Sequence, residues 1–271
     1  MEFDLNEVRR RLDAYDSEIV ELMLQRAQMP LNAKIYTFAN TDLDGAKSRM
    51  IHEHKDILYD EIPTISQVCT FKEYIAAASL LDLSFVAEDD ELASEGRFRS
   101  YCEMPFSPFI GGSKNKSEDA PEMFKGLERL NFNHDIKEWY VHSAVRDLCV
   151  QEDDGRYAEA ILLDRQLLRA VSRRIHYAIF NVAEAKFQAK QDKLVPLIEQ
   201  KQADEIVKLL VHVDREKAVC DGIRDRVIAL QDTGNYSRKV DPKMIADFYQ
   251  KIISITTKGE VNYLMTRNLE L

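Results

Sequence analysis

The segment Val171-Ser-Arg-Arg-Ile-His-Tyr-Ala-Ile-Phe-Asn-Val-Ala-Glu-Ala-Lys-Phe-Gln188 decides how this chain folds. Its apolar residues recur at steps of three and four, which is the period of an amphipathic α-helix. Two cations, Arg174 and Lys186, stand among apolar residues instead of on a polar face. Taken alone, such cations are typical of side chains that snorkel out of a seam between helices.

The same apolar period recurs along most of the chain and predicts an all-α fold. Helices are expected over residues 5–29, 65–98, 133–150, 164–190, 203–211, 214–231 and 244–269. With 9 Gly and 7 Pro, the chain has too few turn residues for a many-stranded β-fold. We therefore expect a single domain over residues 1–271, built as a bundle of long helices. A long loop is expected over residues 103–121, where Pro, Gly and charged residues gather.

The charge balance narrows the classes of partner. The chain has 37 Lys and Arg against 47 Asp and Glu, a formal net charge of −10. A general nucleic-acid binder needs a basic surface that displaces counterions, so the net charge argues against this class and we expect no nucleic-acid partner. A small anionic ligand is still allowed, because a few buried cations can dominate one pocket. The sequence has no apolar run of membrane-spanning length, and its charged N-terminus predicts a cytoplasmic protein, or a secreted one if a signal peptide was removed.

Familiar catalytic and metal-binding motifs are absent from the sequence. It has no glycine-rich phosphate loop, no HExxH and no nucleophile elbow. His52 and His54 have no third ligand nearby, which is typical of a solvated surface pair. Four cysteines are widely scattered: Cys69, Cys102, Cys149 and Cys220. We expect free thiols, or one or two disulfides if the protein is secreted, and neither a metal nor a cofactor.

Several segments of the sequence resemble the all-helical chorismate mutases of fungi and plants. The strongest are Ser172-Arg-Arg-Ile-His-Tyr177 and Ala183-Glu-Ala-Lys-Phe187. Segments similar to other family helices follow the same order: Val8-Arg9, residues 130–140, Ile253-Ser-Ile-Thr256 and Glu260-Val-Asn-Tyr-Leu264. The resemblance is weakest over residues 33–121. It implies an isomerase that converts chorismate to prephenate in the shikimate pathway of aromatic amino-acid biosynthesis, a homodimer, and no cofactor.

The resemblance also assigns functional side chains. Four are implied to be catalytic: Arg9, Arg174, Lys186 and Glu260. Three are implied to contact substrate: Glu216, Thr256 and His212, the last at a position where fungal members often carry Asn.

The implied roles suit a Claisen rearrangement, which needs no nucleophile or metal. Arg9 and Arg174 would grip the two carboxylates of the substrate, since a guanidinium binds a carboxylate through two parallel hydrogen bonds. Lys186 and Glu260 would stabilise charge on the ether oxygen. Glu260 can donate a hydrogen bond only when protonated, so we expect burial and the substrate carboxylates to raise its pKa. Activity should then fall as pH rises.

One spacing departs from the family pattern. Arg174 and Lys186 are 12 residues apart, which is about 120° around an ideal helix. The family has one residue fewer between them, and the extra residue here is most economically Asn181. A π-bulge can absorb a single insertion in a helix. We therefore expect a π-bulge or kink near residues 178–183 that restores the pair.

Regulation is expected to differ as well. The resemblance implies that fungal members sense tryptophan and tyrosine at the dimer interface through a Gly-Ser pair and arginines. Here the pair reads Ala158-Glu159, and Arg97 and Arg99 match the arginines only in part. Glu159 would crowd and repel an amino-acid carboxylate, so we expect little response to either amino acid.

Two other functions compete with an active enzyme. One is a catalytically impaired, chorismate-mutase-like interaction protein, favoured by the extra Asn181, by His212, and by Gly259 inside the last helix. The other is an unrelated helical scaffold whose cations only snorkel. An enzyme requires the four catalytic side chains to converge on one pocket.

Overall fold

The computed structural model describes residues 4–37, 74–75, 78–110, 124 and 130–268. The α-helices are α1 (Leu5–Arg26), α5 (Leu80–Ser94), α6 (Asn133–Trp139), α7 (Val145–Leu148), α8 (Tyr157–Tyr177), α9 (Ala183–Ala189), α10 (Gln191–Glu199), α11 (Ala203–Leu210), α12 (Val213–Thr233) and α13 (Pro242–Thr266). In these ranges there are also the π-helical turns η6 (Tyr140–Ala144) and η7 (Ala178–Val182), and the 3-10 turns η1 (Ala33–Tyr36) and η3 (Arg97–Arg99).

The predicted all-α class is confirmed. The described ranges contain no β-strand, and an isolated bridge joins Pro30 to Val150. Of the expected loop 103–121, residues 103–110 are irregular, and the remainder lies outside the described residues. His52, His54 and Cys69 also lie outside them, as do residues 65–73 and 76–77 of the helix expected over 65–98. Within that range the structure has the shorter helix α5, Leu80–Ser94. Nowhere in the described ranges is a helix both long and apolar enough to cross a membrane.

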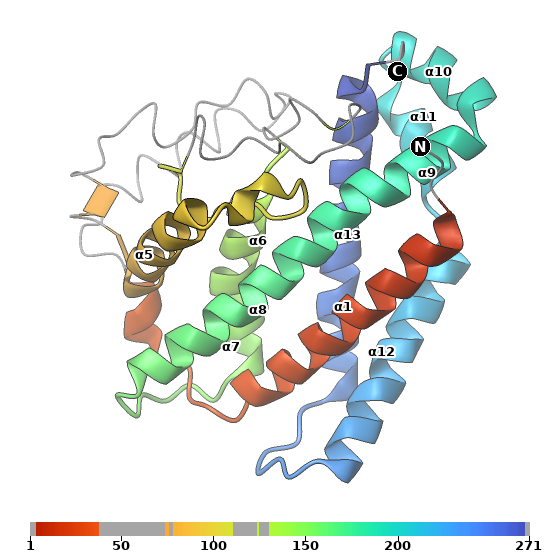
Figure 1. Ribbon diagram of the computed structural model, residues 1–271. Coiled ribbons are helices and arrows are strands. Elements are labelled where there is room, and N and C mark those ends of the chain that lie inside the picture. Colours follow the sequence, from red (N-terminus) through yellow and green to blue (C-terminus); the bar gives the residue numbers. More distant parts are fainter. Residues whose placement is uncertain (1–3, 38–73, 76–77, 111–123, 125–129, 269–271) are drawn as a thin grey trace.

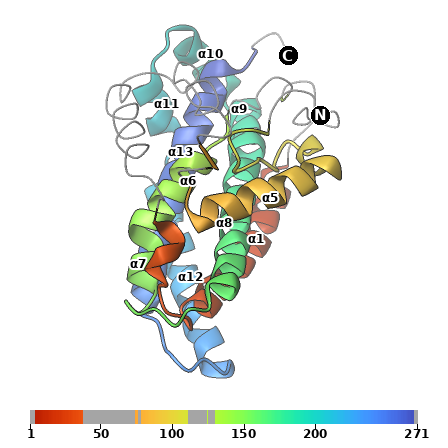
Figure 2. The same cartoon turned by 90° about the vertical axis from the view of Figure 1, so that its left-hand side faces the viewer.

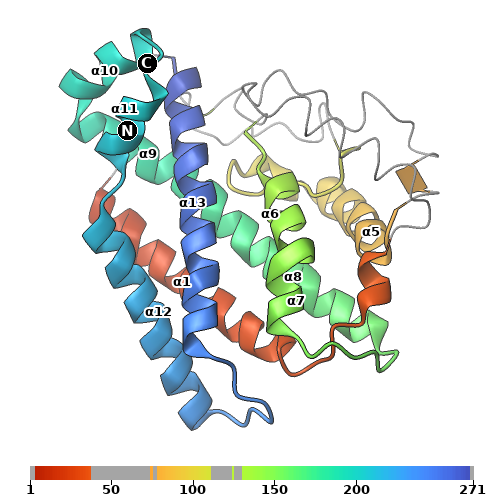
Figure 3. The same cartoon turned by 180° about the vertical axis from the view of Figure 1, so that it is seen from behind.

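The helices form two layers. α1 and α8 run side by side in one layer, and α13 stands behind them next to α6 and α7 (Figures 1 and 2). Seen from behind, α12 lies along α13, and α11 packs near the upper end of α13 (Figure 3). Except for His212, the residues assigned above lie on α1, α8, α9, α12 and α13.

Local sequence signals explain where several helices begin. Asp4 caps α1 by accepting a hydrogen bond from the backbone N–H of Asn6, and Asp241 caps α13 just before Pro242. Ser79 forms a reciprocal capping box with Asp82 at the start of α5. Such side chains satisfy backbone donors that the first turn of a helix leaves unpaired.

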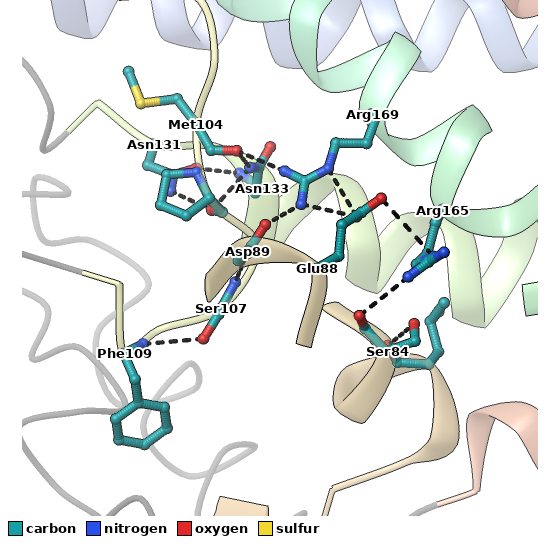
Figure 4. A network of polar contacts seen from close by, with 12 residues as sticks. Ser84, Glu88, Asp89, Met104, Ser107, Phe109, Asn131, Asn133, Arg165 and Arg169 are labelled. Atoms are coloured by element: carbon teal, nitrogen blue, oxygen red, sulfur yellow. Dashed lines mark hydrogen bonds and ion pairs between the residues drawn. The ribbon is translucent and has the colours of Figure 1, made fainter. Parts of the chain in front are cut away.

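Buried charge networks hold the layers together away from the candidate site. Arg26 is fully buried, and its Nε lies 2.7 Å from Oδ1 of Asp164. The hydroxyl of Tyr140 also donates to Oδ1, and that of Tyr36 donates to Oδ2. A second network attaches α5 to α8 through Arg169 (Figure 4). Because each buried charge is paired, these networks avoid the cost of a lone buried ion.

The cysteines of the described ranges are unpaired. Cys102, Cys149 and Cys220 are buried free thiols. Burial raises the pKa of Cys102 to about 12, so this thiol stays protonated and unreactive at neutral pH. These three positions agree with the free-thiol expectation.

Candidate active site

The extra residue between Arg174 and Lys186 is absorbed by a π-helical turn. α8 ends at Tyr177, residues 178–182 form η7, and α9 begins at Ala183. Asn181 lies inside this turn, where its amide nitrogen donates to the carbonyl of Tyr177 at 2.8 Å and its Oδ1 accepts from the hydroxyl of Tyr101 at 3.0 Å. The predicted bulge is confirmed, and both cations now reach α13.

Lys186 and Glu260 form the central contact. The Nζ of Lys186 lies 2.7 Å from Oε2 of Glu260 and 3.3 Å from the carbonyl oxygen of Leu210. Glu260 is only 4% exposed. Burial raises the pKa of Glu260, the nearby charge of Lys186 opposes this rise, and the charge of Glu216 adds to it. The direction agrees with the prediction; burial is its main cause here, and the charge of Glu216 adds to it.

Arg174 is held from two sides. Its Nε donates to Oδ1 of Asp16 at 2.9 Å, and its Nη1 lies 3.4 Å from the hydroxyl of Thr256. Burial lowers the pKa of Arg174, but the charge and hydrogen bond of Asp16 outweigh it and the net shift is upward. Among the described residues Nη2 has no hydrogen-bond partner, so one edge of the guanidinium is left for a ligand.

Gly259 permits the close approach of α13 to η7. A Cβ added at Gly259 would lie 2.2 Å from Cδ1 of Ile179 and 3.2 Å from Cε2 of Phe132. Real side chains cannot approach so closely, so glycine lets the helix carrying Glu260 pack directly on the π-turn. The residue that sequence considerations treat as a weak point is therefore a packing requirement of this site.

Arg9 and Glu216 lie on α1 and α12, two helices that pack against each other. Arg9 is half-buried on α1, and burial followed by the positive charge of Arg215 lowers its pKa. In the described part of the chain the side chain of Arg9 has no ion-pair or hydrogen-bond partner. Glu216 is half-buried in the first turn of α12 and lies close enough to affect the pKa of Glu260. An anion bound here would relieve the repulsion between Arg9 and Arg215.

His212 does not join the cluster. It is exposed, its backbone is extended, and it precedes α12 without capping that helix through its side chain. His212 and Glu216 therefore do not share a continuous helix, because α12 begins at Val213. Thr256 contacts Arg174, and Lys186 contacts Glu260. The charges of Arg174 and Glu216 also act on Glu260. The charge partner of Arg9 is Arg215, the neighbour of Glu216 in the first turn of α12.

Sequence considerations missed the residues that support the cluster. Asp16 lies between Leu12 and Ile19 on the apolar face of α1, so a buried carboxylate there should have suggested a cationic partner. Its backbone carbonyl also accepts a hydrogen bond from Tyr249 at 3.0 Å. Glu184 on α9 is likewise a carboxylate among apolar residues, and it is 0% exposed.

Comparison with known proteins decides the family. A family model described as chorismate mutase type II matches residues 157–261. Chorismate mutase 2 of Petunia hybrida is 33% identical over 192 residues, which is 66% of this chain and 73% of that protein. The chorismate mutase of Pichia angusta is 31% identical over 245 residues, or 83% and 87% of the two chains. This chain belongs to the chorismate mutase family.

The fold agrees with that membership. The chorismate mutase of Candida albicans, solved in complex with L-Trp, superposes with a TM-score of 0.71 over 97% of this chain and 90% of that chain, at 22% identity. Relatives from Zea mays include a chloroplastic and a cytosolic chorismate mutase. The chain is accordingly an isomerase, a chorismate mutase whose substrate is chorismate and whose product is prephenate. The hypothesis of an unrelated helical scaffold is excluded.

Proposed function

We propose that this chorismate mutase works by holding the substrate dianion between Arg9 and Arg174 while Lys186 and protonated Glu260 stabilise the ether oxygen. The observation that carries the proposal is the 2.7 Å contact between Lys186 and Glu260, on the same helix face where Thr256 meets Arg174. Glu216 would receive the substrate hydroxyl, Thr256 would support Arg174, and His212 would contribute only at the rim.

The two arginines supply orientation. Chorismate is flexible, and its rearrangement requires the side chain to fold over the ring. Holding reacting groups in a near-attack geometry can remove up to about 7–11 kcal/mol of a barrier. Arg174 is already fixed by Asp16, so binding one carboxylate requires little reorganisation of its guanidinium.

Lys186 and Glu260 supply electrostatic stabilisation. In the rearrangement the C–O bond breaks as the C–C bond forms, and negative charge grows on the oxygen. Preorganised donors aimed at that oxygen are each worth about 2.7–4 kcal/mol in comparable sites. In the free protein the two side chains bond to each other, so the incoming oxygen would take its place between them.

Loss of turnover in Lys186→Ala tests this mechanism. Lys190 is a matched control, because its Nζ donates to the carbonyl of Leu209 at 2.9 Å just as Lys186 donates to that of Leu210. Chorismate absorbance should decay at least about 100-fold more slowly in Lys186→Ala, and at nearly the wild-type rate in Lys190→Ala. Equal rates in both variants would contradict the proposed mechanism, and a folded wild type without turnover would favour the catalytically impaired interaction protein.

We further propose that tryptophan and tyrosine have little effect on the rate. Ala158 and Glu159 are exposed in the first turn of α8, and Arg97 is already paired with Glu103 at 3.2 Å. A carboxylate arriving there would meet the negative charge of Glu159. A several-fold change in rate with either amino acid would overturn this part.

Family membership supports a homodimer, and the cytosolic relative from Zea mays supports a cytoplasmic location. Both remain proposals for this chain. Light scattering after size exclusion tests the dimer, because a single species at the monomer mass would contradict it.

A further inference from the structure

One face of α13 carries a row of polar side chains toward α8, η7 and α9. The row consists of Thr256, Glu260 and Tyr263 on α13 and of Arg267, the residue that directly follows the helix, at steps of four, three and four. The first two contact Arg174 and Lys186. The last two converge on one residue, Glu184, for which the mechanism above has no use.

Glu184 is a fully paired carboxylate in the interior. Its Oε2 accepts from the hydroxyl of Tyr263 at 2.6 Å and from Nε of Arg267 at 2.7 Å. Its Oε1 accepts from Nη2 of Arg267 at 3.0 Å and from Gln188 at 3.1 Å. The bidentate pairing is geometrically specific, and the guanidinium of Arg267 also lies 4.0 Å from the ring centre of Phe187.

The carboxylate of Glu184 keeps its charge despite its burial. Burial raises its pKa, but hydrogen bonds from Arg267 and Tyr263 outweigh that effect, so the net pKa shift is downward. The cluster of Glu184, Tyr263 and Arg267, which we name the α9–α13 clamp, is therefore a neutral, saturated ion pair. It joins α9 to α13 through directed bonds that tolerate little sliding.

The α9–α13 clamp lies next to the two residues proposed to stabilise the ether oxygen. Glu184 lies two residues before Lys186, and Tyr263 lies three residues after Glu260. α9 follows directly on η7, where the regular hydrogen-bond ladder is interrupted. The direction of α9 is thus not fixed by continuation of α8 and needs a tertiary contact. Lys186 itself has a long, flexible side chain that cannot supply this rigidity.

We propose that Glu184 is a positioning residue for the rearrangement, which holds α9 against α13 through Tyr263 and Arg267 so that the ammonium of Lys186 stays at Glu260. The inference rests on the roles proposed above for Lys186 and Glu260. Arg174 lies before the π-turn and is held by Asp16, so it does not depend on the clamp.

Loosening the clamp should change turnover more than binding. Withdrawal of Lys186 removes a charge that lowers the pKa of Glu260, so that pKa rises further. Because activity requires protonated Glu260, the alkaline fall of activity moves to higher pH while the plateau drops. KM should change little, since the carboxylates are bound by Arg9 and Arg174.

Tyr263→Phe is the principal test, because it removes one bond of the clamp and leaves the ion pair intact. A displacement of about 1 Å at a reacting group can cost about 100-fold, so we expect kcat to fall about 10-fold to 100-fold, with KM within about 2-fold of wild type. The alkaline limb of the kcat profile should move to higher pH. Glu184→Gln should act in the same direction.

Tyr140→Phe is the matched control. Tyr140 is equally buried, and its hydroxyl donates to Oδ1 of Asp164 at 2.5 Å, away from α9 and α13. It should lose a similar amount of stability in urea but keep kcat and the pH profile. Equal kcat losses in Tyr140→Phe and Tyr263→Phe would overturn the inference, and so would wild-type profiles in Tyr263→Phe and Glu184→Gln.

Lys186→Ala in the same series separates the two proposals. If Lys186→Ala is inactive while both clamp variants match wild type, only the clamp is rejected. If Lys186→Ala is fully active, the proposed mechanism itself fails.

Discussion

Replacing Glu260 by Gln should abolish the fall of activity with rising pH. Glu260 is buried, burial raises its pKa, and its Oε2 faces Lys186 at 2.7 Å. In the proposed mechanism only the protonated carboxyl donates to the ether oxygen. Above the pKa of Glu260, the protonated fraction and the rate should each fall about tenfold per pH unit. An amide at the same position donates at every pH.

The assay is initial loss of chorismate absorbance between pH 5 and 9, with kcat extracted at each pH. Wild type should show a single descending limb of unit slope, and Glu260→Gln should be flat across it. Glu260→Ala, which has no donor, should lose about 100-fold to 1000-fold at the acidic plateau. Asp247→Asn is the control, because Asp247 is an exposed carboxylate on the same helix that pairs with Lys243.

Two results would refute this role for Glu260. One is a flat wild-type profile from pH 5 to 9. The other is a descending limb that survives unchanged in Glu260→Gln, because the titrating group would then be a different residue.

Three further predictions concern the scaffold of the site. His176 is fully buried, and burial lowers its pKa to about 4, against about 6.5 in the unfolded chain. Urea titrations should therefore show about 3 kcal/mol of stability lost as the pH falls from 6.5 through 4. His176→Gln should lack this pH-dependent loss. Gly259→Ala should lower stability by about 1–3 kcal/mol and reduce kcat, because its Cβ would displace Ile179, whereas Gly222→Ala, with open space around the Cβ, should be neutral or stabilising. Asp16→Ala should cost about 3–5 kcal/mol in urea unfolding by leaving buried Arg174 unpaired, and it should raise KM; an unchanged KM would separate Asp16 from substrate binding.

Sequence considerations predicted most of the helices because most have their own apolar period, and α1 and α13 also begin at a capping residue. They missed α10, and they placed the start of α8 seven residues too late, since neither helix has a capping side chain at its start. They also predicted the π-turn. If the side chains of Arg174 and Lys186 must lie on the same helix face, an inserted residue between them can be accommodated in few ways. The requirement that the two side chains share a face came from the resemblance to the family. Helical periodicity alone would place them on different faces.

The supporting contacts could not be predicted in the same way. Asp16 and Arg174 lie 158 residues apart, and Glu184 and Arg267 lie 83 apart. Apolar periodicity shows which face of a helix is buried, but it does not show which two faces meet. Gly259 illustrates the difference, because its role depends entirely on the approach of Ile179 from another helix.

In the proposed mechanism, one site holds the substrate dianion between two arginines and places its ether oxygen between Lys186 and Glu260. A crystal structure of the protein with a stable dicarboxylate ether that mimics the rearranging substrate tests this most directly. We predict one carboxylate on Arg174 and the other on Arg9, with the ether oxygen within hydrogen-bond distance of both Lys186 Nζ and the Glu260 carboxyl. An analogue bound elsewhere, or bound here with its ether oxygen turned away from Lys186 and Glu260, would contradict the account.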